Sequence, residues 1–312
     1  MKHFVFLLLL IALLTVCQTV GMAQDIPKTD GKISCEGFDL RYRIVGSKGS
    51  PILILSGGPG ADNRYMQPVA NELSKNYRAV MLEQRGTGRS VLKKYDSSTI
   101  NWKAYFDDIE ALHKHLGINK FILVGNSWGM MLALAYSGTY PDRVEAIVTI
   151  GSGPITSAYA KVFSNNRTSR LSLAELEQRE YWLDSKRSEA DPKRAMYEIH
   201  RAETTAYYYD RKTALKAMME LRLGDENSEI FPAFAELASG FDLRPKLKAI
   251  TAPVLLIQGR QDIAGEANIY EAHLLIKNSI LKFIEKCGHT PWEEHPEQTW
   301  RIVNEFLAAL PK

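Results

Sequence analysis

The sequence predicts an α/β fold in which a mostly parallel sheet carries helices on both faces. Short, nearly continuous apolar runs end at glycine or polar residues, which is typical of parallel strands covered on both sides. These runs lie at residues 51–58, 77–84, 120–125, 144–153 and 253–259. Helical patterns separate most of them, and such alternation of strand and helix favours a doubly wound sheet.

The N-terminal segment is typical of an export signal. Lys2 precedes an apolar stretch over residues 4–16, and small residues at 21 and 23 mark a cleavage site. We therefore expect residues 1–23 to be a signal peptide and the mature protein to be exported, either to the periplasm or from the cell.

Two membrane-attached alternatives fit this segment less well. A transmembrane anchor needs roughly 20 apolar residues, and the stretch over residues 4–16 is shorter. Lipoprotein signals prefer a small residue before the modified cysteine, but Val16 precedes Cys17. The sequence therefore argues against anchoring through Cys17 and against stable membrane insertion after the signal is removed.

Further elements can be assigned in chain order. Residues 32–37 and 40–46 alternate apolar and polar side chains, which predicts an opening antiparallel hairpin. Helices are expected over residues 101–116, 130–137 and 294–310 from their apolar spacing.

The strand pattern stops between residues 154 and 244. Charged helical segments replace it, and a structureless loop of this length is uncommon in a compact domain. We expect a helical cap over residues 154–244, inserted into a core formed by residues 24–153 and 245–312.

The charge balance gives no sign of a charged partner. The chain has 39 basic and 36 acidic side chains and a formal net charge of +3. Nucleic acid and acidic surfaces are therefore not expected as partners. The sequence leaves the oligomeric state open.

Residues 125–129 read Gly-Asn-Ser-Trp-Gly at a strand-to-helix junction. Small flanking residues allow a tight turn that exposes the Ser127 hydroxyl, while the following helix presents its N-terminus to developing negative charge. This pattern predicts a nucleophile elbow. The alternative is that Ser127 simply caps the helix.

A serine nucleophile requires a base and an acid that orients the base. His289 lies in a glycine-containing loop after the last strand, whereas the other histidines lie in helical stretches, in the signal or at the start of the last helix. Asp262 follows the strand at residues 253–259. We predict Ser127, His289 and Asp262 as the catalytic residues, although Asp262 also fits a turn that caps a helix.

The loop Ser-Gly-Gly-Pro-Gly at residues 56–60 follows the first parallel strand. Acyl transfer builds charge on the carbonyl oxygen, and backbone N–H groups stabilise it. We predict that the Gly58 and Trp128 amides form the oxyanion hole. A simple turn is the alternative role for this loop.

Five segments together resemble the proline iminopeptidases and related peptidases of the α/β-hydrolase fold: SGGPG, EQRGTGRS, GNSWGM, GRQD and GHTPW. The resemblance covers the mature chain but is weak in the cap. It implies an α/β-hydrolase fold with an inserted helical cap. Ser56 replaces the histidine usual in this family, and Glu83 replaces an aspartate.

The resemblance also implies that cap glutamates hold the substrate ammonium. Glu203 is the candidate, but the tryptophan that precedes such a glutamate in the family is missing, and a solvated helix face is the alternative. Tyr207, Tyr208 and Tyr209 either line a pocket for a proline ring or pack the cap on the core, and we favour packing.

Ser127 argues against dehalogenases and epoxide hydrolases of this fold, which carry aspartate at the elbow. A Cys35–Cys287 disulfide is not expected, since the first and last strands lie at opposite edges of such a sheet. Cys287 is expected to be a small buried side chain.

The sequence therefore predicts an exported serine aminopeptidase that removes N-terminal proline, or another small residue, from short peptides without a cofactor or metal. Hydrolysis of a carboxylic ester, a lactone or another acyl compound by the same residues is the first alternative, because fold and triad do not define the substrate. A binding protein that has lost turnover is the second.

Overall fold

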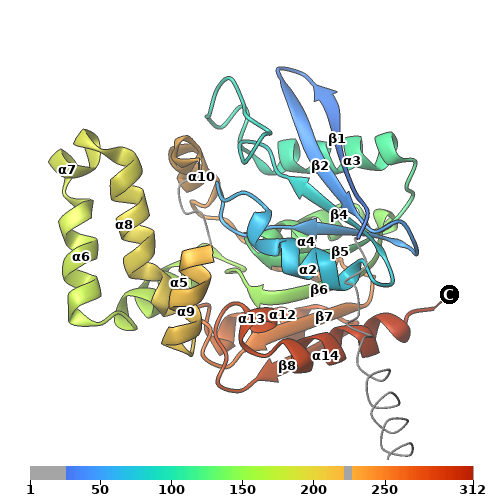
Figure 1. The fold of residues 1–312 in the computed structure, drawn as a ribbon. Coiled ribbons are helices and arrows are strands. Elements are labelled where there is room, and N and C mark those ends of the chain that lie inside the picture. Colours follow the sequence, from blue (N-terminus) through green and yellow to red (C-terminus); the bar gives the residue numbers. More distant parts are fainter. Residues whose placement is uncertain (1–25, 221–226, 312) are drawn as a thin grey trace, which may run out of the picture.

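The computed structural model describes residues 26–220 and 227–311, and an eight-stranded sheet forms its centre (Figure 1). The strand order is β1-β2-β4-β3-β5-β6-β7-β8. β1 and β2 form the predicted antiparallel hairpin, β2 also pairs antiparallel with β4, and the remaining pairs are parallel. The predicted α/β fold with a mostly parallel sheet is confirmed.

The strands follow the predicted apolar runs closely. Their bounds are β1 (Lys28–Cys35), β2 (Phe38–Val45), β3 (Pro51–Leu55), β4 (Arg78–Glu83), β5 (Phe121–Ser127), β6 (Val144–Ser152), β7 (Val254–Gly259) and β8 (Ser279–Ile284). The strands from β3 to β7 are almost entirely buried, as continuous apolar runs predict.

Helices cover both faces of this sheet. They are α2 (Gln67–Leu73), α3 (Trp102–Leu116), α4 (Trp128–Ser137), α12 (Glu266–Leu275), α13 (Pro291–Glu294) and α14 (Pro296–Ala308). The Asn101 side chain caps α3 by accepting a bond from the Ala104 N–H, and left-handed Gly117 ends the helix. The helix expected over residues 294–310 starts at Pro296, because proline fits the first turn.

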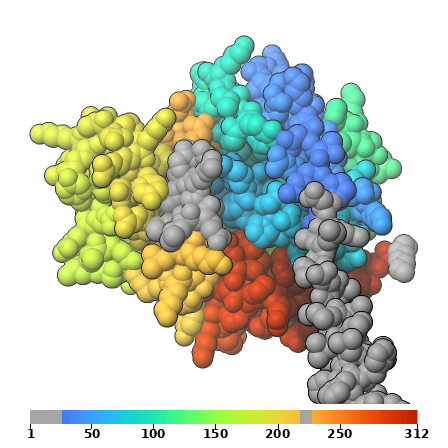
Figure 2. All heavy atoms as spheres, in the orientation of Figure 1, coloured from blue at the N-terminus to red at the C-terminus, as the bar shows by residue number. Residues whose placement is uncertain are grey.

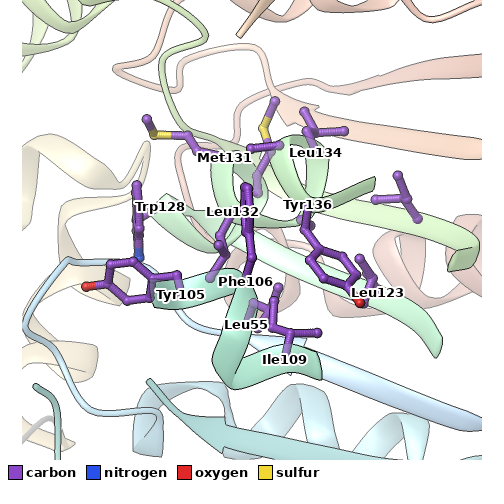
Figure 3. Close-up of a cluster of buried hydrophobic side chains, with 14 of the residues drawn as sticks. Leu55, Tyr105, Phe106, Ile109, Leu123, Trp128, Met131, Leu132, Leu134 and Tyr136 are labelled. Atoms are coloured by element: carbon purple, nitrogen blue, oxygen red, sulfur yellow. The ribbon is translucent and has the colours of Figure 1, made fainter. Parts of the chain in front are cut away.

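Two apolar clusters hold these layers together. One packs α3, α4 and α12 on the sheet, and the other packs α2 and α14 on the opposite face. Figure 3 shows part of the first cluster, in which Trp128 and Tyr136 of α4 lie near Tyr105 and Phe106 of α3. α4 is buried along its whole length, so its N-terminus is held rigidly beneath the end of β5.

The segment between β6 and β7 contributes helices and no strand of the sheet within its described residues. Its helices are α5 (Ser157–Ser169), α6 (Leu173–Leu183), α7 (Ser185–Ala190), α8 (Pro192–Thr204), α9 (Arg211–Glu220), α10 (Phe231–Leu237) and α11 (Arg244–Lys248). α6, α7 and α8 stand apart from the sheet (Figure 1), and Figure 2 shows them as a yellow-green lobe beside the core.

The two ends of this segment lie side by side. Thr156 forms an isolated antiparallel bridge with Asp242. The Leu243 N–H donates to the Ile155 carbonyl oxygen over 2.9 Å. A chain that leaves and re-enters the core at one place is the arrangement expected of an insertion, so we propose that residues 154–244 form one cap unit.

Three sequence predictions concern the termini and the cysteines. The predicted export signal lies outside the described residues. Among the described residues, no helix is long and apolar enough to cross a membrane.

Cys35 and Cys287 are both free thiols. Cys35 lies on β1 and Cys287 lies just after β8, at opposite edges of the sheet. Cys287 is fully buried, as predicted, and burial raises the pKa of its thiol.

Candidate active site

Ser127 ends β5 and directly precedes α4. Its φ of 54° and ψ of −119° lie where side-chain-bearing residues are rarely found. A Cβ added to Gly125 would lie 2.5 Å from the Gly129 carbonyl oxygen, and one added to Gly129 would lie 2.0 Å from that of Leu55. The turn therefore needs both glycines. The Ser127 side chain makes no capping bond to α4, so the alternative role of Ser127 as a helix cap is wrong.

Asp262 and His289 meet in two adjacent loops after β7 and β8. Both carboxylate oxygens of Asp262 lie 2.9 Å from His289 Nδ1, and both side chains are buried. One of these oxygens also accepts a bond from the Ala264 N–H over 2.8 Å. The Gln261 N–H donates to the Cys287 carbonyl oxygen over 2.9 Å, which ties the two loops together.

This contact fixes the tautomer of the neutral imidazole. A carboxylate only accepts hydrogen bonds, so Nδ1 of His289 carries the proton and Nε2 presents a lone pair. Nε2 is buried and has no hydrogen-bond partner among the described residues. A buried lone pair of this kind is what a base needs in order to take a proton from a hydroxyl.

The histidine loop also contacts the residue before Ser127. The Asn126 side-chain amide donates to the Ile150 carbonyl oxygen over 2.7 Å and to that of His289 over 3.4 Å. The structure therefore brings the loop of His289 to the same end of the sheet as Ser127.

The predicted oxyanion loop passes directly beside Ser127. A Cβ added to Gly57 would come within 2.9 Å of the Ser127 Cβ. The Gly57 N–H bonds to the Tyr65 hydroxyl oxygen, whereas the Gly58 N–H has no hydrogen-bond partner among the described residues. The Trp128 N–H belongs to the first turn of α4, where a helix supplies no acceptor.

Tyr65 links this loop to the elbow. Burial raises the pKa of its hydroxyl, so the group remains protonated. The hydroxyl donates to Asn126 Oδ1 over 2.9 Å while its oxygen accepts the Gly57 N–H. The Gly57 N–H is thus held by Tyr65, whereas the Gly58 N–H has no such partner among the described residues.

Gln84 connects the same two elements from the other side. Its side-chain amide donates to the Ser56 carbonyl oxygen over 2.8 Å, and its Oε1 accepts the Trp128 indole N–H over 2.8 Å. Ser56 itself is buried.

Glu83 accepts hydrogen bonds from the Arg89 backbone and guanidinium and so closes the following loop. Both departures from the family pattern are thus accommodated within hydrogen-bonded loops.

The cap contacts the histidine directly. The backbone N–H of His289 donates to the Tyr207 carbonyl oxygen over 2.6 Å. The imidazole ring lies 5.4 Å from the Tyr207 ring and 6.0 Å from the Phe163 ring, measured between centroids. These aromatic rings restrict the movement of the imidazole.

Glu294 joins the cap backbone to the histidine loop. Its Oε1 accepts the Tyr209 and Asp210 N–H groups over 2.8 and 2.9 Å, and its Oε2 accepts the Gly288 N–H over 2.5 Å. A carboxylate that accepts three N–H groups is a strong, charge-assisted connection. The cap segment and the residue before His289 are therefore held by one side chain.

The three cap tyrosines have different environments. Tyr208 is buried, Tyr207 is partly buried against His289, and Tyr209 is 46% exposed. Packing of cap on core therefore describes Tyr208, and Tyr207 alone of the three has a ring in contact with the imidazole.

Glu203 lies in the cap, but its carboxylate is already paired. Oε1 lies 2.7 Å from Arg179 Nε and Oε2 lies 3.1 Å from Arg167 Nη1. Glu203 is 6% exposed, so the alternative of a solvated helix face is wrong. Two guanidiniums also leave little negative charge for a substrate ammonium.

Sequence reasoning missed several residues that shape this site. Gln84 gave a usable signal, since it follows a buried strand at the same sheet edge as Ser56. Asn126 lies inside the elbow motif itself. Glu294 and Arg167 gave no signal, because their partners are far away along the chain. Tyr207 was expected either to line a pocket or to pack, but no local pattern indicated its contact with His289.

Comparison with known proteins places the chain in a family. Residues 50–296 match the α/β-hydrolase fold family. The match spans most of the chain, so the protein belongs to this family. The α/β-hydrolase fold expected from the motifs is confirmed.

Several known proteins are similar to this chain over about nine-tenths of its length. The chain is 24% identical over 307 residues to a proline iminopeptidase of Clostridioides difficile (strain 630), covering 90% of this chain and 98% of the relative. The crystal structure of a proline iminopeptidase from Mycobacterium smegmatis has a TM-score of 0.65 at 18% identity, covering 90% and 98%. That of an enol-lactonase from Burkholderia xenovorans LB400 has a TM-score of 0.64 at 20% identity, covering 91% and 100%. The similarity to proline iminopeptidases expected from the motifs is confirmed.

Proposed function

We propose that the protein is a serine hydrolase that works through an acyl-enzyme. Ser127 attacks the substrate carbonyl carbon while His289 Nε2 takes the hydroxyl proton. Asp262 holds the imidazole and stabilises its protonated form, and the Gly58 and Trp128 N–H groups stabilise the oxyanion. The observation that carries this proposal is the buried Asp262–His289 pair, whose Nε2 is unpartnered among the described residues.

The two half-reactions need no further group. In the first, the imidazolium returns its proton to the leaving amine or alcohol, which departs and leaves an ester on Ser127. In the second, His289 takes a proton from water as the water oxygen attacks the ester carbonyl. The intermediate then collapses, His289 returns the proton to Ser127 Oγ, and the free acid departs.

We propose that the physiological reaction releases an N-terminal proline, or another small N-terminal residue, from short peptides. The support is similarity to proline iminopeptidases over nine-tenths of the chain together with the shared loop motifs. The cap segment that contacts His289 restricts access to small substrates. We further propose that the protein is exported, on the strength of residues 1–23.

Ester or lactone hydrolysis is the alternative. It is favoured by the pairing of Glu203 with two arginines, which removes the predicted counter-charge for an ammonium. A similar fold also occurs in an enol-lactonase.

Hydrolysis of proline p-nitroanilide and of short p-nitrophenyl esters by the purified protein separates the two reactions. Aminopeptidase activity that Ser127→Ala abolishes would establish the first. Ester turnover with no release of p-nitroaniline would overturn the first and leave the second.

A further inference from the structure

Arg167 shares its carboxylate partner with a second cap arginine. Glu203 is buried and pairs with both Arg167 and Arg179, whose side chains are 24% and 18% exposed. Arg179 has a second carboxylate partner in Glu180, which is 65% exposed. The carboxylate of Glu203 is the one ion-pair partner of Arg167 within the described residues.

Arg167 also has an unused donor. Its Nε is buried and has no hydrogen-bond partner among the described residues. Buried donors without acceptors are rare in folded proteins and call for an explanation. A guanidinium offers several N–H groups in a planar fork, and the pairing with Glu203 uses only Nη1.

Arg167 lies on the side of the cap that contacts the imidazole. It follows Phe163 by one helical turn on α5, so the two side chains share a face of that helix. Phe163 contacts both His289 and Tyr207, with ring centroids 6.0 and 6.2 Å apart. The Arg167 guanidinium lies close enough to the Tyr207 side chain to interact with it electrostatically.

We propose that Arg167 binds a carboxylate of the substrate. This rests on the proposed function of Ser127 and defines the substrate class further. In a short peptide the group is the C-terminal carboxylate; in an ester it is a carboxylate on the acyl part. A guanidinium is suited to this role because it stays charged and pairs with carboxylates through directed N–H groups.

Two matched substrate pairs test the proposal. Prolylglycine and prolylglycinamide differ only in the carboxylate of the leaving part. Mono-p-nitrophenyl succinate and p-nitrophenyl butyrate make the corresponding comparison on the acyl part. Wild-type protein should prefer the carboxylated member of one pair by about 10-fold or more in kcat/KM, the size expected for a charge-assisted contact.

Arg167→Gln should remove this preference, so that both members of the pair are hydrolysed with similar kcat/KM. Arg179→Gln is the matched control, because it also takes one arginine from Glu203 but does not alter Arg167. Arg179→Gln should keep the preference. Arg167→Lys retains charge without the fork and should restore part of it.

The outcomes are distinguishable from failure of the proposed function. If neither member of either pair is hydrolysed, the proposed chemistry fails, and binding of prolylglycine and succinate to the wild-type protein and to Arg167→Gln by calorimetry decides the carboxylate site. Binding that Arg167→Gln abolishes supports the site. Activity with no preference in the wild type, or equal loss on charged and neutral substrates in Arg167→Gln and Arg179→Gln, overturns it.

Discussion

Asp262 and Glu203 are both buried carboxylates near the proposed active site, but their partners differ. Asp262 faces one imidazole, and both of its carboxylate oxygens lie 2.9 Å from Nδ1. Glu203 faces two guanidiniums from two other cap helices and forms a structural ion-pair group. The role of a buried carboxylate therefore depends on its partners. Asp262 can stabilise positive charge that forms on the imidazole during a reaction, whereas the charge of Glu203 is already balanced by guanidiniums.

Removing the Asp262 carboxylate should lower kcat far more than removing the Glu203 carboxylate. Asp262→Asn should lower kcat by about 10³ to 10⁴, because an amide no longer fixes the tautomer or stabilises the imidazolium. Glu203→Gln should lower kcat by less than about 10-fold. Turnover of an ester substrate by both variants, with circular dichroism as a check on folding, decides the point. Equal losses would show that the two carboxylates have similar roles.

A buried carboxylate in the core, Asp108, should contribute to stability through its ion pair. Arg85 and Asp108 form a buried bidentate ion pair with both bonds at 2.7 Å. Asp108→Asn leaves the guanidinium uncompensated and should lower the free energy of unfolding by about 3–5 kcal/mol.

The adjacent residue provides the control in urea denaturation. Asp107 pairs with Lys103 on the surface, and both side chains are more than half exposed. Asp107→Asn should therefore change stability by less than about 1 kcal/mol. Similar destabilisation by both variants would refute the distinction.

Glu294 tests whether the cap supports the histidine loop. Glu294→Gln should reduce kcat about 10-fold, because an amide cannot accept all three N–H groups. KM should change less, since the side chain acts through His289. The exposed Glu297, on α14, is the matched control. A variant with unchanged kcat would mean that the histidine loop holds its geometry without the cap.

The smallest effect concerns pH. His113 is buried and donates from Nδ1 to the Ile118 carbonyl oxygen over 2.8 Å. Burial lowers its pKa from the ordinary 6.5, so below that pH the unfolded chain binds the proton more readily and stability falls.

Wild-type protein should therefore lose unfolding free energy between pH 7 and 5.5 relative to His113→Phe, by at most about 1 kcal/mol because the unfolded histidine has an ordinary pKa. Denaturation of both proteins at each pH measures this difference, in which other titrating groups cancel. Parallel pH curves would show that His113 titrates alike in the folded and unfolded states.

The core was predictable because its signals are local. Strand runs end within a few residues of Ser127, Asp262 and His289. Because the strands are parallel, their carboxyl ends lie at the same end of the sheet. The cap was predictable only as helical. Glu203, Arg167 and Arg179 come from three different helices, and no local pattern states which charges will pair.

The proposed chemistry requires that His289 activates the Ser127 hydroxyl. Labelling with a fluorophosphonate probe, followed by peptide mass mapping, tests it most directly. We expect a single adduct on Ser127 in the wild-type protein, no adduct in Ser127→Ala, and much slower labelling in His289→Ala. Absence of labelling in the wild type, or an adduct on another residue, would contradict it and favour a binding protein that keeps the fold without turnover.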